Sequence, residues 1–169
     1  MNIVLFGFMG VGKTTVGRLL APSLGYRFVD SDMVAERVMR MKISTAFHRL
    51  GEEEFRTVER RVIRNLVRED GLVIALGGGA VLDPRNVETM RREGKMVLLT
   101  ASPEEICRRT LRDFTRPLLI GEDRVGRIRN LLEERLEKYL ASADVIVDTN
   151  GVSPLSVAKM IKSRVEADC

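Results

Sequence analysis

A glycine-rich loop follows the first apolar run of the chain, and no other feature restricts the fold as strongly. The run NIVLF at residues 2–6 leads directly into GFMGVGKTT at residues 7–15. This loop matches the pattern G-x-x-x-x-G-K-S/T, whose glycines let backbone N–H groups curl around phosphates. The helical pattern KTTVGRLLAPSL comes next and would direct its positive N-terminal dipole at the same anion. The sequence therefore predicts a strand, a phosphate-binding loop and a helix, with a nucleoside triphosphate as ligand.

Two side chains of this loop have expected roles in binding the nucleotide. Lys13 is expected to reach the β- and γ-phosphates, and the Thr14 hydroxyl is expected to bind Mg²⁺. A chance glycine-rich turn is the alternative, but the required order of strand, loop and helix argues against it. The residues predicted to contact the nucleotide here are Gly10, Val11, Gly12, Lys13, Thr14 and Thr15.

The size and composition of the chain favour one globular domain. Its 169 residues are enough to bury a core but few for two domains, so we expect a single domain over residues 1–169. No apolar run approaches the roughly 18 residues of a membrane span. The first strand leaves no room for a signal peptide. These features predict a cytoplasmic protein with no membrane partner.

The charge pattern indicates small anionic partners instead of nucleic acid. The net charge is +4, but acidic and basic residues alternate along helical stretches such as EEEFRTVERRVIRNLVRED, as on solvated helix faces. No basic platform with interleaved aromatic residues is present. The two cysteines, Cys107 and Cys169, have no metal-binding spacing, and Cys107 is expected to be buried on a helix. The single histidine, His48, is expected on a helix surface or in a structural hydrogen bond.

Short apolar runs alternate with helical patterns along the whole chain. The runs are continuous, as in buried parallel strands, and lie at 2–6, 27–30, 72–76, 95–99 and 144–148. The helical patterns between and after them cover 13–24, 31–41, 52–69, 84–93, 103–112, 124–142 and 154–167. Alternation of this kind predicts a doubly wound α/β sheet. Two insertions, at 31–70 and 113–123, are expected to build an acceptor site and a lid.

Acidic residues and glycines stand where two of these strands end. VDSD ends the second strand, so Asp30 could hold the water shell of Mg²⁺ and Asp32 could hydrogen-bond or deprotonate an attacking hydroxyl. A helix N-cap at Ser31 or Asp32 is the structural alternative. The third strand runs into GGGAV at 77–81, which offers only backbone at its glycines and suits close approach of a small ligand. A tight turn without a ligand is the alternative there.

Three arginines lie in segments that could converge on the strand ends. They are Arg56 in EEEFRTVE, Arg116 in TRPLL and Arg135 in LEERLEKY. A planar guanidinium suits a carboxylate or a phosphate. Any single arginine of a basic chain is more often a surface residue, and the sequence does not reveal whether these three meet.

Taken in order, these motifs resemble the shikimate kinase family over nearly the full chain. The matching segments are GFMGVGKTTVGRLLA, FVDSD, GEEEFRTVE, LGGGAV, TRPLL, ERLEKY and ADVIVDT. The resemblance implies a three-layer αβα P-loop kinase fold with a five-stranded parallel sheet in the order 2-3-1-4-5. It also implies transfer of the γ-phosphoryl of ATP to the 3-hydroxyl of shikimate, within aromatic amino-acid biosynthesis.

The resemblance further implies a role for each matching residue. Catalysis would depend on Lys13, Asp32 and the lid residue Arg116. Arg109 in CRRT would flank the adenine, and Arg116 would also contact ATP. The acceptor would be bound by Asp32, Arg56, Gly78, Gly79 and Arg135. The metal, Mg²⁺, would be bound by Thr14 and, through water, by Asp30.

Two other classes of function remain open from the sequence. Another small-molecule kinase, for gluconate or a nucleotide, could use the same fold, because two arginines that bind a carboxylate do not by themselves select shikimate. A nucleotide-binding module without turnover is the other class, although such a module has no need of the candidate base Asp32. We expect a monomer, since no exposed heptad or long hydrophobic face is evident.

Overall fold

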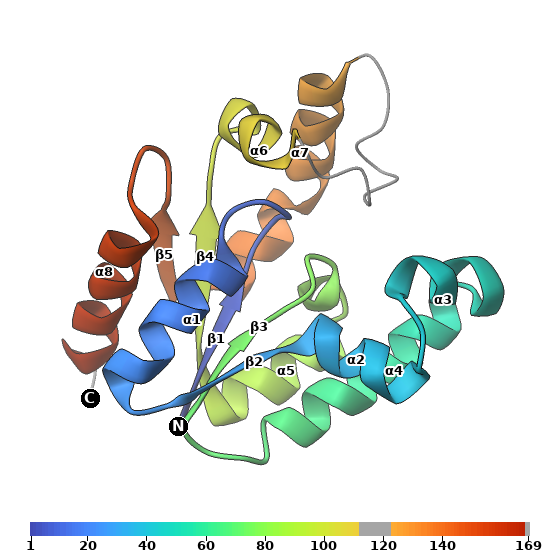
Figure 1. Cartoon of the computed structure of the whole chain (residues 1–169), viewed down its shortest axis with the longest axis horizontal. Helices are drawn as coiled ribbons and strands as arrows, with labels where there is room; N and C mark the ends of the chain where they lie inside the picture. The colour runs from blue at the N-terminus through green and yellow to red at the C-terminus, as the bar shows by residue number, and fades with distance from the viewer. Residues whose placement is uncertain (112–122, 168–169) are drawn as a thin grey trace.

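The computed structural model describes residues 1–111 and 123–167, which form a five-stranded parallel sheet between two layers of helices (Figure 1). The sheet order is β2-β3-β1-β4-β5, as the family resemblance implied. The strands are β1 (Asn2–Phe6), β2 (Arg27–Asp30), β3 (Leu72–Ala75), β4 (Gly94–Thr100) and β5 (Val145–Asp148).

Helices cover both faces of this sheet. On one face α1 packs against α8, and on the other α4 packs against α5, with α7 beside them (Figure 1). The helices are α1 (Lys13–Leu24), α2 (Ser31–Met39), α3 (Ile43–Leu50), α4 (Glu52–Leu66), the short 3₁₀ helix η1 (Ala80–Leu82), α5 (Pro84–Glu93), α6 (Pro103–Thr110), α7 (Arg124–Ser142) and α8 (Pro154–Ala167). The three-layer prediction is therefore confirmed.

Burial along the strands follows their place in the sheet. Every residue of the central strand β1 is buried, as is every residue of its neighbour β3. A strand that carries helices on both faces has no side exposed to water, so its sequence is a continuous apolar run. The edge strand β5 instead alternates, with Val145 and Val147 buried and Ile146 and Asp148 exposed. The pattern of apolar residues thus distinguishes the middle of the sheet from this edge.

The insertion after β2 forms three helices that pack on one another: α2, α3 and α4. The sequence predicted a helix over 31–41, but α2 ends at Met39 because Arg40 adopts a left-handed conformation with φ of 55°. The Arg40 N–H donates to the Arg37 carbonyl, which closes the helix. At the next boundary α4 ends at Leu66, three residues before the predicted end.

Predictions were also made for three single residues. His48 is exposed on α3, as predicted. Cys107 lies on α6 but is only partly buried, so its predicted burial is incomplete, while Cys169 falls outside the described residues. Over residues 1–111 and 123–167, no helix combines the length and the apolar character that crossing a membrane requires.

Candidate active site

The glycine-rich loop after β1 adopts a backbone that few other residues could follow. Gly7, Gly10 and Gly12 have φ values of 134°, 78° and 101°, in the region that L side chains rarely enter. A Cβ built on Gly7 would also lie 2.3 Å from the Leu99 carbonyl oxygen of β4. Gly12 then caps the N-terminus of α1, where helix N–H groups have no partner within the helix. The loop thus has the geometry of a phosphate-binding site.

Lys13 folds back over this loop. Its Nζ donates to the carbonyl oxygen of Gly7 at 3.0 Å and to that of Phe8 at 2.9 Å. The side chain is half-buried. The ammonium group therefore lies beside the loop that is predicted to bind phosphates.

Thr14 and Asp30 meet at the ends of the loop and of β2. The Thr14 hydroxyl donates to Asp30 Oδ2 at 2.9 Å. The other oxygen of Asp30 accepts from the N–H groups of Asp32 and Met33, at 3.1 and 3.4 Å, and so caps α2. The helix cap is therefore Asp30, not Ser31 or Asp32 as the structural alternative supposed. Asp30 is thus both the last residue of β2 and the N-cap of α2.

This pair offers the hard oxygen ligands that Mg²⁺ prefers. No group of three or more histidine, cysteine, aspartate or glutamate side chains that could enclose a metal occurs among the described residues. Mg²⁺ does not need such an enclosure, because it commonly keeps several waters and binds one or two protein ligands together with substrate phosphates. The residues present therefore fit a Mg²⁺–nucleotide complex.

The glycine triplet at 77–79 lies against three of the predicted site residues. A Cβ built on Gly77 would lie 2.4 Å from Asp32 Oδ1, and one on Gly79 would lie 2.6 Å from Arg56 Nη2. A Cβ on Gly78 would lie 4.0 Å from Arg135 Nη1. These three side chains come from three different helices: α2, α4 and α7. The triplet is thus the place where Asp32, Arg56 and Arg135 converge, which the sequence could not establish.

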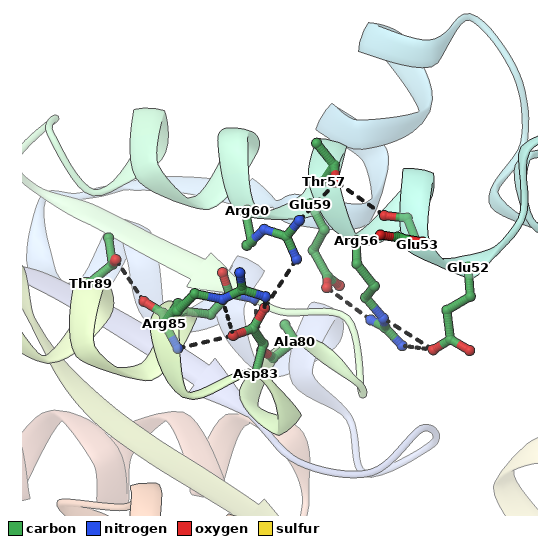
Figure 2. A network of polar contacts seen from close by, with 11 residues as sticks. Glu52, Glu53, Arg56, Thr57, Glu59, Arg60, Ala80, Asp83, Arg85 and Thr89 are labelled. Carbon is green, nitrogen blue, oxygen red and sulfur yellow. Dashed lines mark hydrogen bonds and ion pairs between the residues drawn. The ribbon is translucent and has the colours of Figure 1, made fainter.

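Arg56 is held by two glutamates of its own helix, as Figure 2 shows. Its guanidinium donates to Glu59 Oε2 at 2.8 Å and to Glu52 Oε1 at 3.2 Å. Its central carbon also lies 5.9 Å and 5.4 Å from the ring centroids of Phe47 and Phe55. Burial alone would lower the pKa of Arg56, but the two glutamates raise it overall. The side chain therefore stays charged and fixed in direction.

Glu59 is the more buried of these two partners. Its side chain is 5% exposed, against 66% for Glu52. Burial raises the pKa of Glu59, the charges of Asp32 and Asp83 add to that rise, and Arg56 opposes it. Because an unpaired charge is costly to bury, Glu59 and Arg56 depend on each other.

Arg135 and Tyr139 approach the triplet from α7. The Arg135 guanidinium lies 5.6 Å from the ring centroid of Phe8, a residue of the phosphate-binding loop. The Tyr139 hydroxyl donates to the Gly78 carbonyl oxygen at 2.7 Å. Burial raises the pKa of the Tyr139 hydroxyl, while the nearby charge of Arg135 acts in the opposite direction. Thus Arg135 lies between the loop and the triplet.

Arg109 joins two loops at the same end of the sheet. It donates to the Thr149 hydroxyl at 2.9 Å, to the Thr149 carbonyl at 2.7 Å and to the Val11 carbonyl at 3.3 Å. Glu105 on the same helix also accepts from Arg109, at 2.7 Å. Arg109 is therefore fixed beside the phosphate-binding loop. Arg116 and positions 113–122 of the predicted lid lie outside the described residues.

Several residues of this region were not found from the sequence. Glu59 and Tyr139 stand three and four positions after Arg56 and Arg135, the spacings at which helical side chains are neighbours. That spacing is a signal that could have found them. Phe8 and Thr149 gave no such signal, because their contacts join segments far apart in the chain.

Comparison with known proteins agrees with this geometry. The family model described as shikimate kinase matches residues 9–166. A shikimate kinase of Moorella thermoacetica is 45% identical over 166 residues, which cover 98% of this chain and 95% of that protein. A shikimate kinase of Thermodesulfovibrio yellowstonii is 42% identical over 160 residues, covering 95% and 92%.

A solved structure gives the same result in three dimensions. The shikimate kinase of Acinetobacter baumannii, in complex with shikimate, superposes with a TM-score of 0.93 at 39% identity and covers 99% of this chain and 93% of that one. The shikimate kinase of Aquifex aeolicus superposes with a TM-score of 0.83 at 33% identity, covering 99% and 98%. With a shared fold, a matching family model and this degree of identity over nearly its full length, the chain belongs to the shikimate kinase family.

Proposed function

We propose that this protein transfers the γ-phosphoryl group of ATP to the 3-hydroxyl of shikimate, giving shikimate 3-phosphate and ADP. One observation carries the proposal above the others. A carboxylate and two guanidinium groups, from Asp32, Arg56 and Arg135, gather around a glycine triplet beside the phosphate-binding loop. That set suits an acceptor that carries both hydroxyls and a carboxylate.

Arg56 and Arg135 are proposed to bind the shikimate carboxylate. A guanidinium can form two parallel hydrogen bonds to a carboxylate, and such charge-assisted pairs are strong and directional. Gly78 and Gly79 would present backbone to the ring, since neither has a side chain to exclude it. Asp32, which lies against Gly77, would bind hydroxyl groups of the shikimate ring.

The nucleotide is proposed to bind at the loop that begins the chain. Residues 10–15 would cradle its phosphates, with Lys13 as the charged clamp. Arg109 would flank the adenine. Thr14 would bind Mg²⁺ directly and Asp30 through water; when bound, the metal would neutralise charge on the β- and γ-phosphates.

The chemical step needs positioning and charge stabilisation more than covalent catalysis. Asp32 would accept the proton of the shikimate 3-hydroxyl while the hydroxyl oxygen attacks the γ-phosphorus and ADP leaves. Lys13, and Arg116 from the lid, would stabilise the charge on the transferring group. Exclusion of water by the lid, predicted over 113–123, would limit hydrolysis of ATP.

The setting of the reaction follows from the sequence predictions. We propose a single kinase domain that acts as a monomer in the cytoplasm on ATP and shikimate, without nucleic acid or membrane as a partner. The insertion at 31–70 would supply the acceptor site through α2 and α4.

The test is ADP release from Mg·ATP measured side by side with shikimate, gluconate, a nucleoside monophosphate and no acceptor. We expect shikimate alone to stimulate release. Stimulation by gluconate or the nucleotide alone would retain the kinase fold but contradict the acceptor assignment. Tight ATP binding with no stimulation by any acceptor would favour the non-catalytic module.

A further inference from the structure

We infer that Tyr139 is a positioning residue of the acceptor site, whose hydroxyl holds the Gly78 peptide in place beside the Arg135 guanidinium. The inference rests on the proposed function, because it assigns Tyr139 a part in binding the acceptor. Tyr139 itself touches neither substrate in this proposal and acts through its two neighbours.

The first observation is the position of the Tyr139 hydroxyl beside both Gly78 and Arg135. The Tyr139 hydroxyl donates to the Gly78 carbonyl oxygen at 2.7 Å, and the Arg135 guanidinium is close enough to oppose the rise of the Tyr139 pKa that burial causes. Because Arg135 and Tyr139 are four positions apart on α7, their side chains lie on the same face of the helix.

The second observation is that the ring of Tyr139 is fixed independently of its hydroxyl. The residue is 3% exposed and packs against Phe6 at the end of β1, with the ring centroids 6.2 Å apart and the planes at 74°. Edge-to-face pairs of this kind add to the stability from burial. Tyr139→Phe would therefore keep the packing and remove only the hydroxyl with its hydrogen bond to Gly78.

The third observation is the position of the Gly78 peptide between the two substrate sites. A Cβ built on Gly78 would lie 3.6 Å from the Gly7 carbonyl oxygen and 3.7 Å from the Met9 amide nitrogen, both in the phosphate-binding loop. The same Cβ would lie 4.0 Å from Arg135 Nη1. By holding the carbonyl of this peptide, Tyr139 fixes α7 to the segment that separates ATP from the acceptor.

Removal of the hydroxyl has a definite expected effect. The Gly78 carbonyl loses its donor, so the peptide next to Arg135 can shift and the guanidinium is free to leave the direction in which it would meet a carboxylate. We expect Tyr139→Phe to raise the KM for shikimate about three- to tenfold, the range for one ordinary hydrogen bond. The KM for ATP should change less than twofold, since neither partner binds the nucleotide.

The chain offers a matched control for this variant. It contains two tyrosines, and Tyr26 stands just before β2, at the opposite end of the sheet from Gly78. Tyr26→Phe removes the same group far from the site and should leave both KM values unchanged. A purely structural role of Tyr139 would lower the melting temperature of Tyr139→Phe while leaving the ratio of the two KM values at that of the wild type.

The decisive experiment is a double-mutant cycle between Tyr139→Phe and Arg135→Ala, with shikimate KM as the readout. If Tyr139 acts through Arg135, the double variant should lose less than the product of the two single losses, because the second change removes a group already displaced. Full multiplicative losses, or an unchanged shikimate KM in Tyr139→Phe, would overturn the inference. Failure of the wild type to use shikimate would instead overturn the proposed function, so the two failures are distinct.

Discussion

At the residue scale, Arg56 has one partner suited to hold it and another suited to release it. Glu59 is buried and would be left as an unpaired charge if the pair broke, whereas Glu52 is 66% exposed and loses little by returning to water. We therefore expect the acceptor carboxylate to replace Glu52 and not Glu59. Arg56 would then remain anchored on one side while it binds on the other.

Removing either acceptor arginine should weaken shikimate binding without affecting ATP. We expect Arg56→Ala and Arg135→Ala each to raise the KM for shikimate about 10- to 150-fold, which corresponds to about 1.5–3 kcal/mol for a hydrogen bond to a charged group. The measurement is steady-state kinetics with each substrate varied in turn.

Arg61→Ala is the matched control for Arg56→Ala, because Arg61 lies on α4 with Arg56 but is exposed. Wild-type shikimate kinetics in both Arg56→Ala and Arg135→Ala would contradict the acceptor assignment. Equal loss of ATP binding would instead indicate damage to the whole site.

A second prediction concerns Gly79. A methyl group there would meet Arg56 Nη2 at 2.6 Å, closer than such atoms can approach. The guanidinium is the end of a flexible side chain, so Gly79→Ala should displace it, but the shift also weakens its pair with the buried Glu59. We therefore expect a raised shikimate KM together with a lower melting temperature. An unchanged KM would mean that the position of Arg56 does not matter.

The identity of the site residues could be predicted from the sequence, but their meeting could not. Lys13, Thr14 and Asp30 belong to contiguous strand–loop–helix segments, and their spacing alone brings them to one edge of the sheet. Arg56 and Arg135 lie on helices from different parts of the chain. Their approach depends on how α4 and α7 pack around the glycine triplet, which no local pattern records.

At the element scale, one carboxylate fastens the start of α5 to α4. Asp83 caps α5 by accepting from the Arg85 N–H at 3.0 Å, and its side chain also accepts from Arg85 Nη2 and Arg60 Nη1 at 2.9 and 3.2 Å (Figure 2). Arg60 lies one position after Glu59 on α4, and Asp83 directly follows η1. The contact therefore fixes the helix that carries Arg56 relative to the segment after the glycines.

Loss of this cap should reduce stability in a pH-dependent way. Hydrogen bonding by Arg85 is the main cause that lowers the pKa of Asp83 to about 2, below the ordinary value of 3.8. The stabilisation is therefore complete above about pH 4 and disappears as the pH falls through about 2. We expect Asp83→Ala to lower the free energy of unfolding by about 1 kcal/mol near pH 7.

Urea unfolding at a series of pH values measures this effect. The difference between Asp83→Ala and the wild type should shrink as the pH approaches 2. Asp83→Asn is the control, because asparagine also caps helices and should lose only the part that depends on charge. A difference that stays constant down to pH 2 would contradict the assigned role of the carboxylate.

Except for α3, whose range was not predicted, the helices were predictable to within a few residues, and the differences at their ends have local causes. The predicted helix at 31–41 ends early because Arg40 takes a left-handed conformation, which is rare for a residue other than glycine and carries no mark in the sequence. The cap of α2 was assigned to Ser31 or Asp32, since either residue type caps well. The structure uses Asp30, the last residue of β2, because α2 begins directly after it at Ser31.

At the scale of the whole molecule, the strand order brings both predicted substrate sites to one end of the sheet. β1 lies between β3 and β4, so the phosphate-binding loop after β1 is next to the glycine triplet after β3. The order itself does not follow from the alternation of strands and helices, which is compatible with several doubly wound sheets. It was predictable only through the family resemblance.

Ligand binding should stabilise the whole domain, and the two sites should be separable by one substitution. At one hundred times its dissociation constant a ligand stabilises the folded state by about 2.7 kcal/mol. For a chain of this size that shift raises the melting temperature by about 5–11 °C. We expect this with Mg·ATP and with shikimate in thermal unfolding.

Lys13→Met should lose most of the Mg·ATP shift, because it removes the charged clamp, and should keep the shikimate shift. The variant preserves most of the side chain's apolar length, so the fold is not at issue. Retention of the full Mg·ATP shift in Lys13→Met would contradict the role of Lys13 in binding phosphate.

The glycine triplet has a consequence for how accurately the site can be assembled. Side chains that are positioned only by their own helices differ in position whenever those helices shift, whereas side chains that contact one common backbone segment keep their positions relative to it. Residues 77–79 are that common segment, since Asp32, Arg56 and Arg135 each lie against a different glycine of it. We therefore expect the spacing among the two guanidinium groups and the carboxylate to stay nearly constant when α2, α4 or α7 shifts slightly during evolution, because the glycine backbone sets it.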